Sequence, residues 1–350
     1  MNNSEIAILL PYKENFNFNE AGSASLWVKD FFLNSKLKSK TTIYGINHKK
    51  KSLTKNFCNL KFKMPKFYLS RNKTYAETFY KVIIDTRVKV IEIHNRPEIF
   101  NYLVRKNLNC KYILVFHNNP NELRGSKTVH EKNKILQYCD ALIFVSHFTK
   151  KQFFYNLKIK DNSKAKVIYP SIRSPKKISY KEKLITFFGK LNHLKGYDIF
   201  GEAIINILNK HNDWKAVVAG DEKKEKYNFK HKNLKIYNWL NHKRILKILS
   251  KSSICIVPST WDEPFGRIAM EASNFGNATI ISRRGGLTET SNHCIKLKEV
   301  NSKEIINKIE TLILNKNRLL KIQKLSFNNP KIIFSDNIYK LDNIKYKLLN

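Results

Sequence analysis

The sequence predicts an α/β protein made of two domains, each a parallel sheet covered by helices. Three observations predict this class. Short apolar segments of strand length alternate with amphipathic segments of helix length, which is the pattern of βαβ units. The chain has 350 residues, enough for two such domains. A polar, Lys-rich stretch, Ser174–Lys183, interrupts the pattern, so the boundary is expected within 171–182.

The first domain, residues 1–172, is expected to alternate strands and helices from its first apolar run onward. Its expected strands are short apolar runs bounded by turn or polar residues: 6–10, 42–46, 88–93, 112–116, 141–145 and 167–169. Apolar periodicity predicts helices over 26–32, 75–84 and 99–105. Ser146 is expected to cap a further helix, and 48–55 is expected to be a solvated loop.

The second domain, residues 183–325, repeats the alternation. Its expected strands are 184–188, 214–219, 234–237, 254–257, 278–282 and 295–297, and its expected helices include 197–208, 244–249, 302–314 and 317–325. One more helix is expected to open at Pro264, since proline suits the first helical position, and to stop at Gly276. The segment 326–350 is expected to be partly helical.

Composition bounds the protein class. Apolar residues make up 42% of the chain, which favours a globular core over disorder. No run of about 18 apolar residues exists to span a bilayer, and the N-terminus lacks the basic start of a signal peptide. The five cysteines are scattered without metal-ligand spacing, which is typical of thiols in a reducing cytoplasm.

The formal charge of +37 allows nucleic acid, an anionic membrane or an anionic substrate as partner. The excess of basic residues is +9 over 151–200 and +7 over 51–100, but only +1 over 251–300. Compositional bias toward Lys explains part of this charge. The sequence shows no RNA-binding aromatic signature and no zinc-finger spacing, so we expect no nucleic-acid partner.

The near-neutral stretch 254–290 holds the residues best suited to chemistry. Glu263 lies in a loop after a predicted strand, at the edge of the sheet where parallel sheets bind ligands, and Glu271 follows in the next helix. Two separated carboxylates suit a ligand with two sets of hydroxyls. Between them, the N–H groups of Phe265, Gly266 and Arg267 favour phosphate at a helix N-terminus. Together these groups fit a nucleotide sugar, although an ordinary helix with solvated glutamates explains a bare Glu pair as well.

The flanking residues resemble a known family. Glu263-Pro-Phe-Gly, then Glu271-Ala, then an apolar strand and Gly285-Gly286 resemble the donor-site signature of the family 4 retaining glycosyltransferases. The family's order of motifs can be followed over roughly the whole chain. The resemblance implies the GT-B fold, two facing Rossmann-like domains with the active site in the interdomain cleft. It also implies that Glu263 meets the transferred sugar, that Glu271 meets the ribose, and that 326–350 crosses back to the first domain.

Two glycine-containing loops are further candidates for donor binding. In one, Gly189 lets the chain turn, and Lys190 and Lys195 can then neutralise a leaving diphosphate. Two exposed lysines in a Lys-rich chain explain the same residues, but the resemblance implies a basic pair that contacts the diphosphate. In the other loop, Gly22 precedes a helix and lets backbone N–H groups approach a phosphate.

Two strands of the first domain deliver a histidine at their carboxyl ends, His94 and His117. The resemblance implies that His117 contacts the donor sugar and lines the reaction centre. His94 resembles the family's His-rich turn, where Asn95-Arg96 replaces the usual acidic continuation. We therefore place His94 and Arg96 on the acceptor side, with Arg96 as a candidate for an anionic acceptor.

The expected function is transfer of a sugar, with retention, from a nucleotide diphosphate sugar to a glycan or lipid-linked acceptor, as in lipopolysaccharide synthesis. No cofactor is expected, and no metal, because no Asp-x-Asp cluster exists. The protein is expected to be cytoplasmic, and Lys49–Lys51 with Lys55, Lys61 and Lys63 favour docking on anionic lipid; a solvated face explains them equally. The alternatives are a GT-B epimerase or phosphorylase and, in another class, a nucleic-acid-binding protein.

Overall fold

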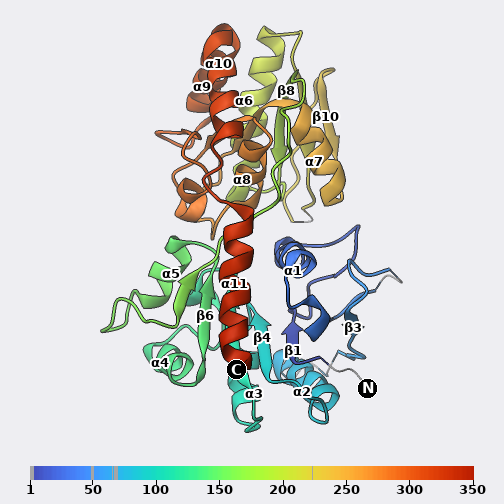
Figure 1. Ribbon diagram of the computed structural model, residues 1–350. Helices are drawn as coiled ribbons and strands as arrows, with labels where there is room; N and C mark the ends of the chain where they lie inside the picture. Colours follow the sequence, from blue (N-terminus) through green and yellow to red (C-terminus); the bar gives the residue numbers. More distant parts are fainter. Residues whose placement is uncertain (1–3, 49–50, 65, 67–69, 223) are drawn as a thin grey trace. The chain divides into compact units, whose positions relative to one another are not determined.

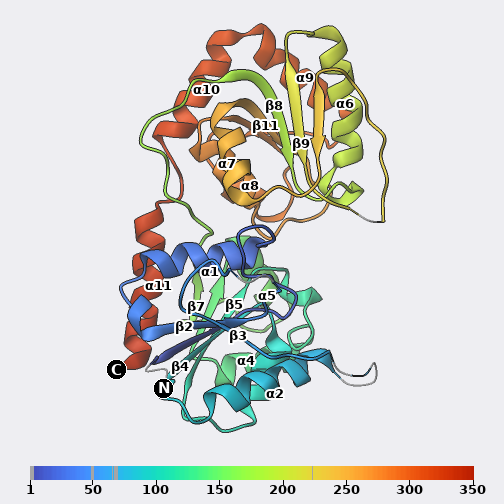
Figure 2. The ribbon, with the colours of Figure 1, turned by 90° about the vertical axis from the view of Figure 1, so that its right-hand side faces the viewer.

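The computed structural model describes residues 4–48, 51–64, 66, 70–222 and 224–350 (Figures 1 and 2). The chain forms two compact α/β units. Unit 1 contains residues 1–170 and 335–350, and unit 2 contains residues 171–334. The return of the chain to unit 1 was expected from residue 326, and it begins at Ser335 instead. The reason is that α10 (Lys316–Asn328) packs on unit 2, where Gln323 donates to the Ser253 carbonyl oxygen at 3.1 Å.

The described residues of unit 1 form a seven-stranded parallel sheet in the order β3-β2-β1-β4-β5-β6-β7. Its strands are β1 Ile6–Leu9, β2 Thr41–Gly45, β3 Phe57–Asn59, β4 Val90–His94, β5 Lys111–Phe116, β6 Ala141–Phe144 and β7 Ala165–Val167. Its helices are α1 Ser23–Asn34, α2 Arg71–Ile83, α3 Pro97–Val104, α4 Val129–Tyr138, α5 His147–Phe154 and α11 Phe334–Leu349, with short 3-10 turns at Lys38–Lys40 and Pro120–Glu122.

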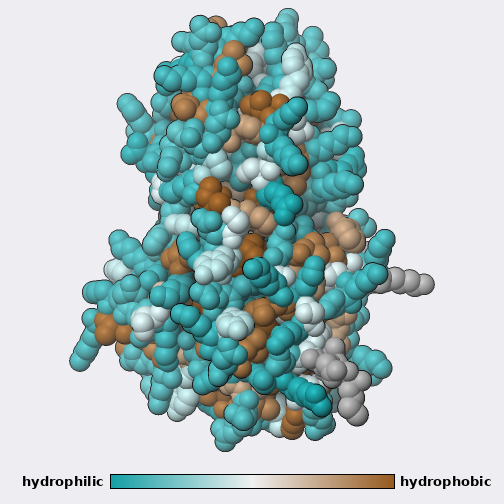
Figure 3. Space-filling model, in the orientation of Figure 1, coloured by the Kyte–Doolittle hydropathy of each residue, from teal (hydrophilic) through white to brown (hydrophobic). Residues whose placement is uncertain are grey.

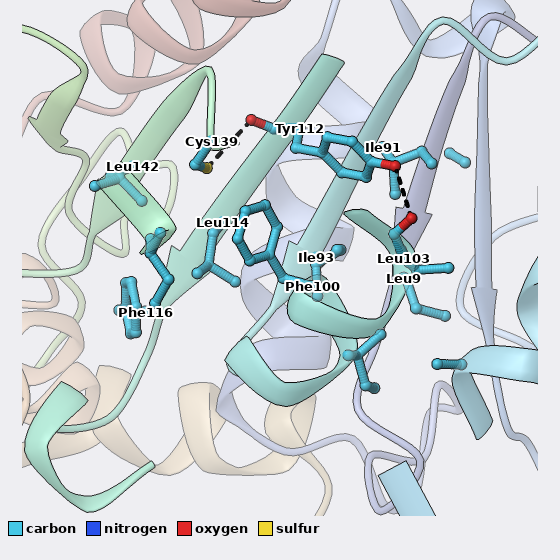
Figure 4. Packing of buried hydrophobic residues seen from close by; sticks show 14 of the residues in the cluster. Leu9, Ile91, Ile93, Phe100, Leu103, Tyr112, Leu114, Phe116, Cys139 and Leu142 are labelled. Carbon is cyan, nitrogen blue, oxygen red and sulfur yellow. Dashed lines mark hydrogen bonds between the residues drawn. The ribbon is translucent and has the colours of Figure 1, made fainter. Parts of the chain in front are cut away.

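Side chains of β4 alternate between the two faces of this sheet, as the period of two requires. Ile91 and Ile93 enter the main core, which packs against α2, α3 and α4 (Figure 4). In that core the Tyr112 hydroxyl donates to the Leu103 carbonyl oxygen at 3.3 Å. Glu92 and His94 point to the opposite face, where residues of α1 and α11 meet them.

The described residues of unit 2 form a six-stranded parallel sheet in the order β10-β9-β8-β11-β12-β13. Its strands are β8 Glu182–Phe188, β9 Lys215–Ala219, β10 Leu234–Tyr237, β11 Ser252–Val257, β12 Ala278–Ile281 and β13 Ile295–Lys296. Besides α10, its helices are α6 Tyr197–Lys210, α7 His242–Lys251, α8 Arg267–Asn274 and α9 Ser302–Leu314, with 3-10 turns at His193–Lys195 and Gly285–Glu289.

Both sheets have a point where the strand order reverses. In unit 1 it lies between β1 and β4, and in unit 2 it lies between β8 and β11. The chain leaves these neighbouring strands in opposite directions, so their loops part and leave a crevice at the carboxyl edge. The loops after these four strands are therefore where each unit is best built to hold a ligand.

Three local expectations are corrected. Pro264 does not open the helix, because Gly266 adopts a left-handed conformation (φ 101°) and α8 begins only at Arg267. Strand β3 was not expected, since its side chains are only partly buried and its apolar pattern is short. Helix α4 was not expected either, although a capping box formed by Thr128 and Glu131 starts it. Ser146 caps α5 by accepting from the Thr149 N–H at 3.0 Å, as predicted.

Hydrophilic side chains dominate the face of the molecule drawn in Figure 3. The five cysteines are unpaired thiols. Across the described ranges, no helix combines the length and apolarity that crossing a membrane requires.

Candidate functional site

Glu263 lies in the loop after β11 and meets the loop after β8. Its Oε1 accepts from the Ser259 hydroxyl at 2.6 Å and from Lys195 Nζ at 2.5 Å. Lys195 Nζ also lies 5.1 Å from the centre of the Trp261 ring. The structure thus brings together two predicted site residues, Glu263 and Lys195, which are far apart in sequence.

Glycines hold both of these loops in place. Gly196 is left-handed (φ 69°), and a Cβ there would lie 2.3 Å from the Pro258 carbonyl oxygen at the end of β11. At Gly286, whose N–H donates to the Glu263 carbonyl oxygen at 2.7 Å, a Cβ would lie 2.5 Å from the Pro264 carbonyl oxygen. Because no other residue fits such approaches, these glycines fix Lys195 and Glu263 against each other.

Glu271 lies one turn into α8 and is fully buried. Its Oε1 accepts from Arg267 Nε at 2.6 Å and lies 2.8 Å from His242 Nε2 on α7. Burial alone would raise the pKa of Glu271, but His242 and Arg267 outweigh it and hold the pKa at about 2. Glu271 is therefore ionised at neutral pH.

The second oxygen of this carboxylate, Oε2, is buried and has no hydrogen-bond partner in the described part of the chain. A buried ionised oxygen is rarely left in this state, because the missing hydrogen bond costs free energy. Among ligand groups, a hydroxyl is well suited to supply the missing donor.

The N-terminus of α8 lies between the two glutamates. Gly266 is its N-cap, and the first turn of the helix begins next to Phe265 and Arg267. Such a terminus favours an anion. The predicted order of carboxylate, helix terminus and carboxylate is thus present along one segment of unit 2.

Gly189 and Lys190 follow β8 on the same edge of the sheet. The Gly189 N–H donates to the Ala219 carbonyl oxygen at 3.1 Å, and a Cβ on Gly220 would lie 1.7 Å from the Gly189 carbonyl oxygen. Lys190 is exposed and forms no ion pair with any described carboxylate, so its charge is available to a ligand. Its role, like that of Gly189, stays a prediction.

In unit 1, His94 and His117 lie together in a buried polar chain. His94 Nδ1 is 2.8 Å from His117 Nε2, and His94 Nε2 is 2.7 Å from Glu92 Oε1. Lys345 of α11 completes the chain, with its Nζ 2.7 Å from Glu92 Oε2. Trp27 of α1 contacts both imidazoles edge-on, at 5.3 and 5.6 Å between ring centres.

The charge of Glu92 sets the hydrogen bonding of the pair. Burial alone would raise the pKa of Glu92, but Lys345 and His94 outweigh it and hold the pKa at about 2. Because Glu92 is ionised, Nε2 of His94 carries the proton that it donates to the carboxylate. Nδ1 is then the His94 atom that faces His117.

Gly22 precedes α1, as predicted, and is its N-cap. A Cβ on Gly22 would lie 2.7 Å from Glu14 Oε2, so a carboxyl group of the chain itself lies at this helix N-terminus. Burial raises the pKa of Glu14. Donor binding by Gly22 stays a prediction.

Four residues of these networks were not predicted: Glu92, Lys345, His242 and Ser259. Glu92 could have been recognised from the sequence, since a carboxylate inside the apolar run Val90–His94 needs a partner once it is buried. Ser259 could also have been recognised, because it follows a buried strand at the carboxyl edge of the sheet, where parallel sheets bind ligands. Nothing in the local sequence marks His242 or Lys345, whose partners come from distant segments.

Known proteins resemble the chain in sequence and in fold. Residues 169–327 match the family model described as "Glycosyl transferases group 1". An uncharacterized glycosyltransferase of Methanocaldococcus jannaschii is 26% identical over 193 residues, which is 48% of this chain and 49% of the relative. An uncharacterized 42.6 kDa protein in the cps region of Klebsiella pneumoniae is 25% identical over 243 residues, 63% of this chain and 64% of the relative. The chain therefore spans about half to two thirds of the length of these relatives.

Among solved structures, HepE of Anabaena in complex with UDP and glucose superimposes with a TM-score of 0.72 at 14% identity. The alignment covers 98% of this chain and 99% of HepE. At this identity the likeness shows the fold.

Proposed function

We propose that the chain, which has the GT-B fold, is a retaining glycosyltransferase that uses a nucleotide diphosphate sugar. The group 1 glycosyl transferase match over unit 2 supports transfer of a sugar. One observation carries the donor assignment: buried, ionised Glu271 leaves Oε2 without a hydrogen-bond donor. A ribose hydroxyl supplies that donor, and Glu263 is then free to bind hydroxyls of the sugar through its second oxygen.

In the proposed reaction, an acceptor hydroxyl oxygen bonds to the anomeric carbon on the face that the leaving diphosphate vacates. The bond between that carbon and the phosphate oxygen breaks, and the leaving phosphate oxygen takes the proton of the acceptor hydroxyl. Lys190, Lys195 and the N-terminus of α8 stabilise the charge that develops on the phosphate. His117, a residue of unit 1, contacts the transferred sugar. His94 orients the imidazole of His117 through the 2.8 Å contact between Nδ1 and Nε2.

A donor screen tests this function on the full chain. Unfolding temperature is measured with UDP-, ADP- and GDP-sugars, because a ligand of the folded state raises it. One donor is expected to stabilise the wild type, and Glu271→Ala is expected to lose about 1–3 kcal/mol of donor affinity in calorimetry. Glu202→Ala, an exposed glutamate of the same unit, is the matched control and keeps full affinity. Tight RNA binding with no response to any nucleotide sugar would overturn the proposal.

We further propose that the reaction needs no metal or other cofactor, because lysines and a helix terminus supply positive charge at the phosphate. Transfer is expected to proceed unchanged in EDTA. Inactivation by EDTA and recovery with magnesium would contradict the metal-free reaction, but not the assignment as a glycosyltransferase.

We also propose that the acceptor is a glycan or lipid-linked sugar, built at the cytoplasmic face of a membrane as in lipopolysaccharide synthesis. Lys51, Lys55, Lys61 and Lys63 are exposed, and Lys49 and Lys50 lie outside the described residues. Clustered lysines contribute about 1 kcal/mol each near anionic lipid. The protein is expected to sediment with anionic vesicles but not with neutral ones, and rising salt is expected to release it. If it binds neither kind of vesicle at low salt, the acceptor is soluble instead.

A further inference from the structure

Unit 1 carries a pocket of about 600 Å³ at the point where its strand order reverses. Tyr12 and Lys13 follow β1 and line one side, and Asn95 and Arg96 follow β4 and line the other. The remaining lining residues are Pro97, which opens α3, and residues from the start of α2 and from the segment after β5. This is where a doubly wound sheet binds its ligand, and the pocket lies wholly within unit 1.

The pocket is strongly basic. Lys13, Arg71, Arg96 and Arg124 line it, and Glu122 is the single carboxylate among the described lining residues. Lys13, Arg71 and Arg124 are exposed and form no ion pair with any described residue. Four cations and one carboxylate among the lining residues favour an anionic ligand.

Arg96 is the central residue of this pocket. It is half-buried, and within the described chain its guanidinium makes one hydrogen bond, from Nη1 to the Asn95 carbonyl oxygen at 2.7 Å. Glu14 and Glu98 act on it electrostatically, but among the described residues neither comes within ion-pair distance. Burial lowers the pKa of Arg96, yet arginine stays charged at neutral pH. Most of the N–H donors of this guanidinium, which lines the pocket, therefore have no acceptor among the residues that the structure describes, a geometry suited to a carboxylate or phosphate.

The pocket also offers a site for a hydroxyl. Asn72 lines it and donates through Nδ2 to Glu98 Oε2 at 2.7 Å. Its Oδ1 is buried and has no hydrogen-bond partner within the described chain. Because Oδ1 only accepts, the missing partner is a donor, such as a hydroxyl close to the anionic group.

Asn95 joins the pocket to the histidine pair. Its Oδ1 accepts from the backbone N–H groups of His117 and Asn118 at 3.2 and 3.0 Å. Asn95 holds a left-handed conformation (φ 55°), which is uncommon outside glycine and is typical of functional turns. A ligand in the pocket is thus held next to the residue that fixes the backbone of His117.

We propose that this pocket binds the acceptor by an acidic group, a phosphate or carboxylate that lies beside a hydroxyl. The term acceptor rests on the proposed function; the anion site itself does not. The fork of Arg96 binds the acidic group, the other basic side chains add charge, and Asn72 accepts from the hydroxyl. Specificity for an acidic acceptor then resides in unit 1 alone.

Calorimetry on the full chain, without donor, tests the site with three probes: glycerol 3-phosphate, glucuronate and neutral methyl glucoside. At least one acidic probe is expected to bind, and the neutral glycoside is expected not to. Whether glycerol 3-phosphate or glucuronate binds more tightly distinguishes a phosphate from a carboxylate acceptor. Equal binding of the neutral glycoside, or no binding of either acidic probe, overturns the proposal.

Matched variants separate the pocket from the overall charge of the protein. Arg96→Gln with Arg124→Gln is expected to weaken the acidic probe at least tenfold. Lys158→Gln with Lys160→Gln removes the same charge from exposed positions of unit 1 outside the pocket and is expected to change affinity less than twofold. Arg124→Gln alone, at an exposed position, covers the case in which the Arg96 variant unfolds. Equal losses in both double variants would mean that binding is non-specific.

The donor assay keeps this inference distinct from the proposed function. Arg96→Gln with Arg124→Gln is expected to bind the nucleotide sugar normally, and Glu271→Ala is expected to bind the acidic probe normally. If the wild type binds the acidic probe but none of the nucleotide sugars, the glycosyltransferase proposal is removed and the anion site stays. Donor binding with no acidic probe bound removes the anion site and leaves the enzyme.

Discussion

The two points of strand reversal share a topology but differ in their electrostatics. In unit 2 the loops after β8 and β11 bring opposite charges together, so that Lys195 and Glu263 neutralise each other at 2.5 Å. In unit 1 the loops after β1 and β4 bring Lys13 and Arg96 to one pocket, where neither forms an ion pair with a described carboxylate. The same arrangement of strands thus presents a paired lysine and glutamate in one unit and a basic pocket in the other.

The ion pairs of the two units also differ in burial. Lys345 and Glu92 are 5% and 0% exposed, whereas Lys195 and Glu263 are 25% and 8% exposed. Water and ligands can replace a partner at the more open pair, but not at the closed one. The pair in unit 1 is therefore expected to matter for stability, and the pair in unit 2 for activity.

Removal of Lys345 is expected to have the largest effect. Lys345→Met leaves Glu92 charged in the core, which typically costs about 3–5 kcal/mol of unfolding free energy. Denaturant unfolding measures this loss. Lys347→Met, at an exposed position of the same helix, is the control and is expected to change little. A Lys345 variant as stable as this control would mean that the two pairs do not differ as their burial indicates.

Removal of Lys195 is expected to act on turnover rather than on stability. Lys195→Ala and Lys190→Ala are each expected to slow transfer by roughly 10²–10³-fold, as loss of one preorganised charge-stabilising group often does. Initial rates at saturating donor, on protein shown to be folded, measure this. Lys183→Ala, on the exposed part of β8, is expected to keep wild-type rates. A normal rate in either loop variant removes that lysine from the reaction.

Acid should weaken the chain through the buried carboxylates. The pKa of Glu92 is about 2 in the folded state, below its ordinary value of 4.5, so its contribution is complete above about pH 4.5 and is lost as pH falls toward 2. The difference corresponds to about 3 kcal/mol. Unfolding measured from pH 6 to pH 3 is expected to show a flatter slope for Glu92→Gln combined with Lys345→Met. An unchanged slope would assign the acid sensitivity to other groups, with Glu271 next to be tested.

Two asparagines in left-handed conformations are expected to give the smallest effects. Asn107 (φ 51°) is exposed, so Asn107→Gly relieves strain and is expected to stabilise the chain by about 0.5–1 kcal/mol. Asn95→Gly relieves similar strain but removes the oxygen that accepts from His117 and Asn118, so a net loss is expected. Thermal unfolding compares the two. A rise in unfolding temperature for both variants would show that the Asn95 side chain does not stabilise the protein through the His117 and Asn118 N–H groups.

Much of the fold was predictable because apolar periodicity is local. Strands such as β5 and β11 and helices such as α6 and α9 were predicted to within a few residues. Helix α8 began later than expected because Gly266 is left-handed and a Cβ there would lie 2.3 Å from Leu287 Cδ2, a tertiary approach that no local pattern encodes.

The site was predictable only in part, for the same reason. Glu263 and Glu271 were proposed through a motif, and the structure places Lys195 Nζ 2.5 Å from Glu263 Oε1. Their supporting residues were missed, because a pair such as Glu92 and Lys345 joins segments more than two hundred residues apart. A buried charge shows that a partner must exist, but only the fold shows which residue it is.

The return of α11 to unit 1 has a consequence for biosynthesis. Residues 1–170 leave the ribosome before unit 2, yet their core keeps Glu92 without Lys345 until that residue has been made. Asp342 likewise supplies the acceptors for the Ser35 hydroxyl and the Lys36 N–H only at that stage. At ~5–20 residues per second, the intervening unit takes about 10–30 s to synthesise. Unit 1 is therefore completed only after unit 2 has been synthesised, and during that interval we expect it to be more open to chaperones and proteases.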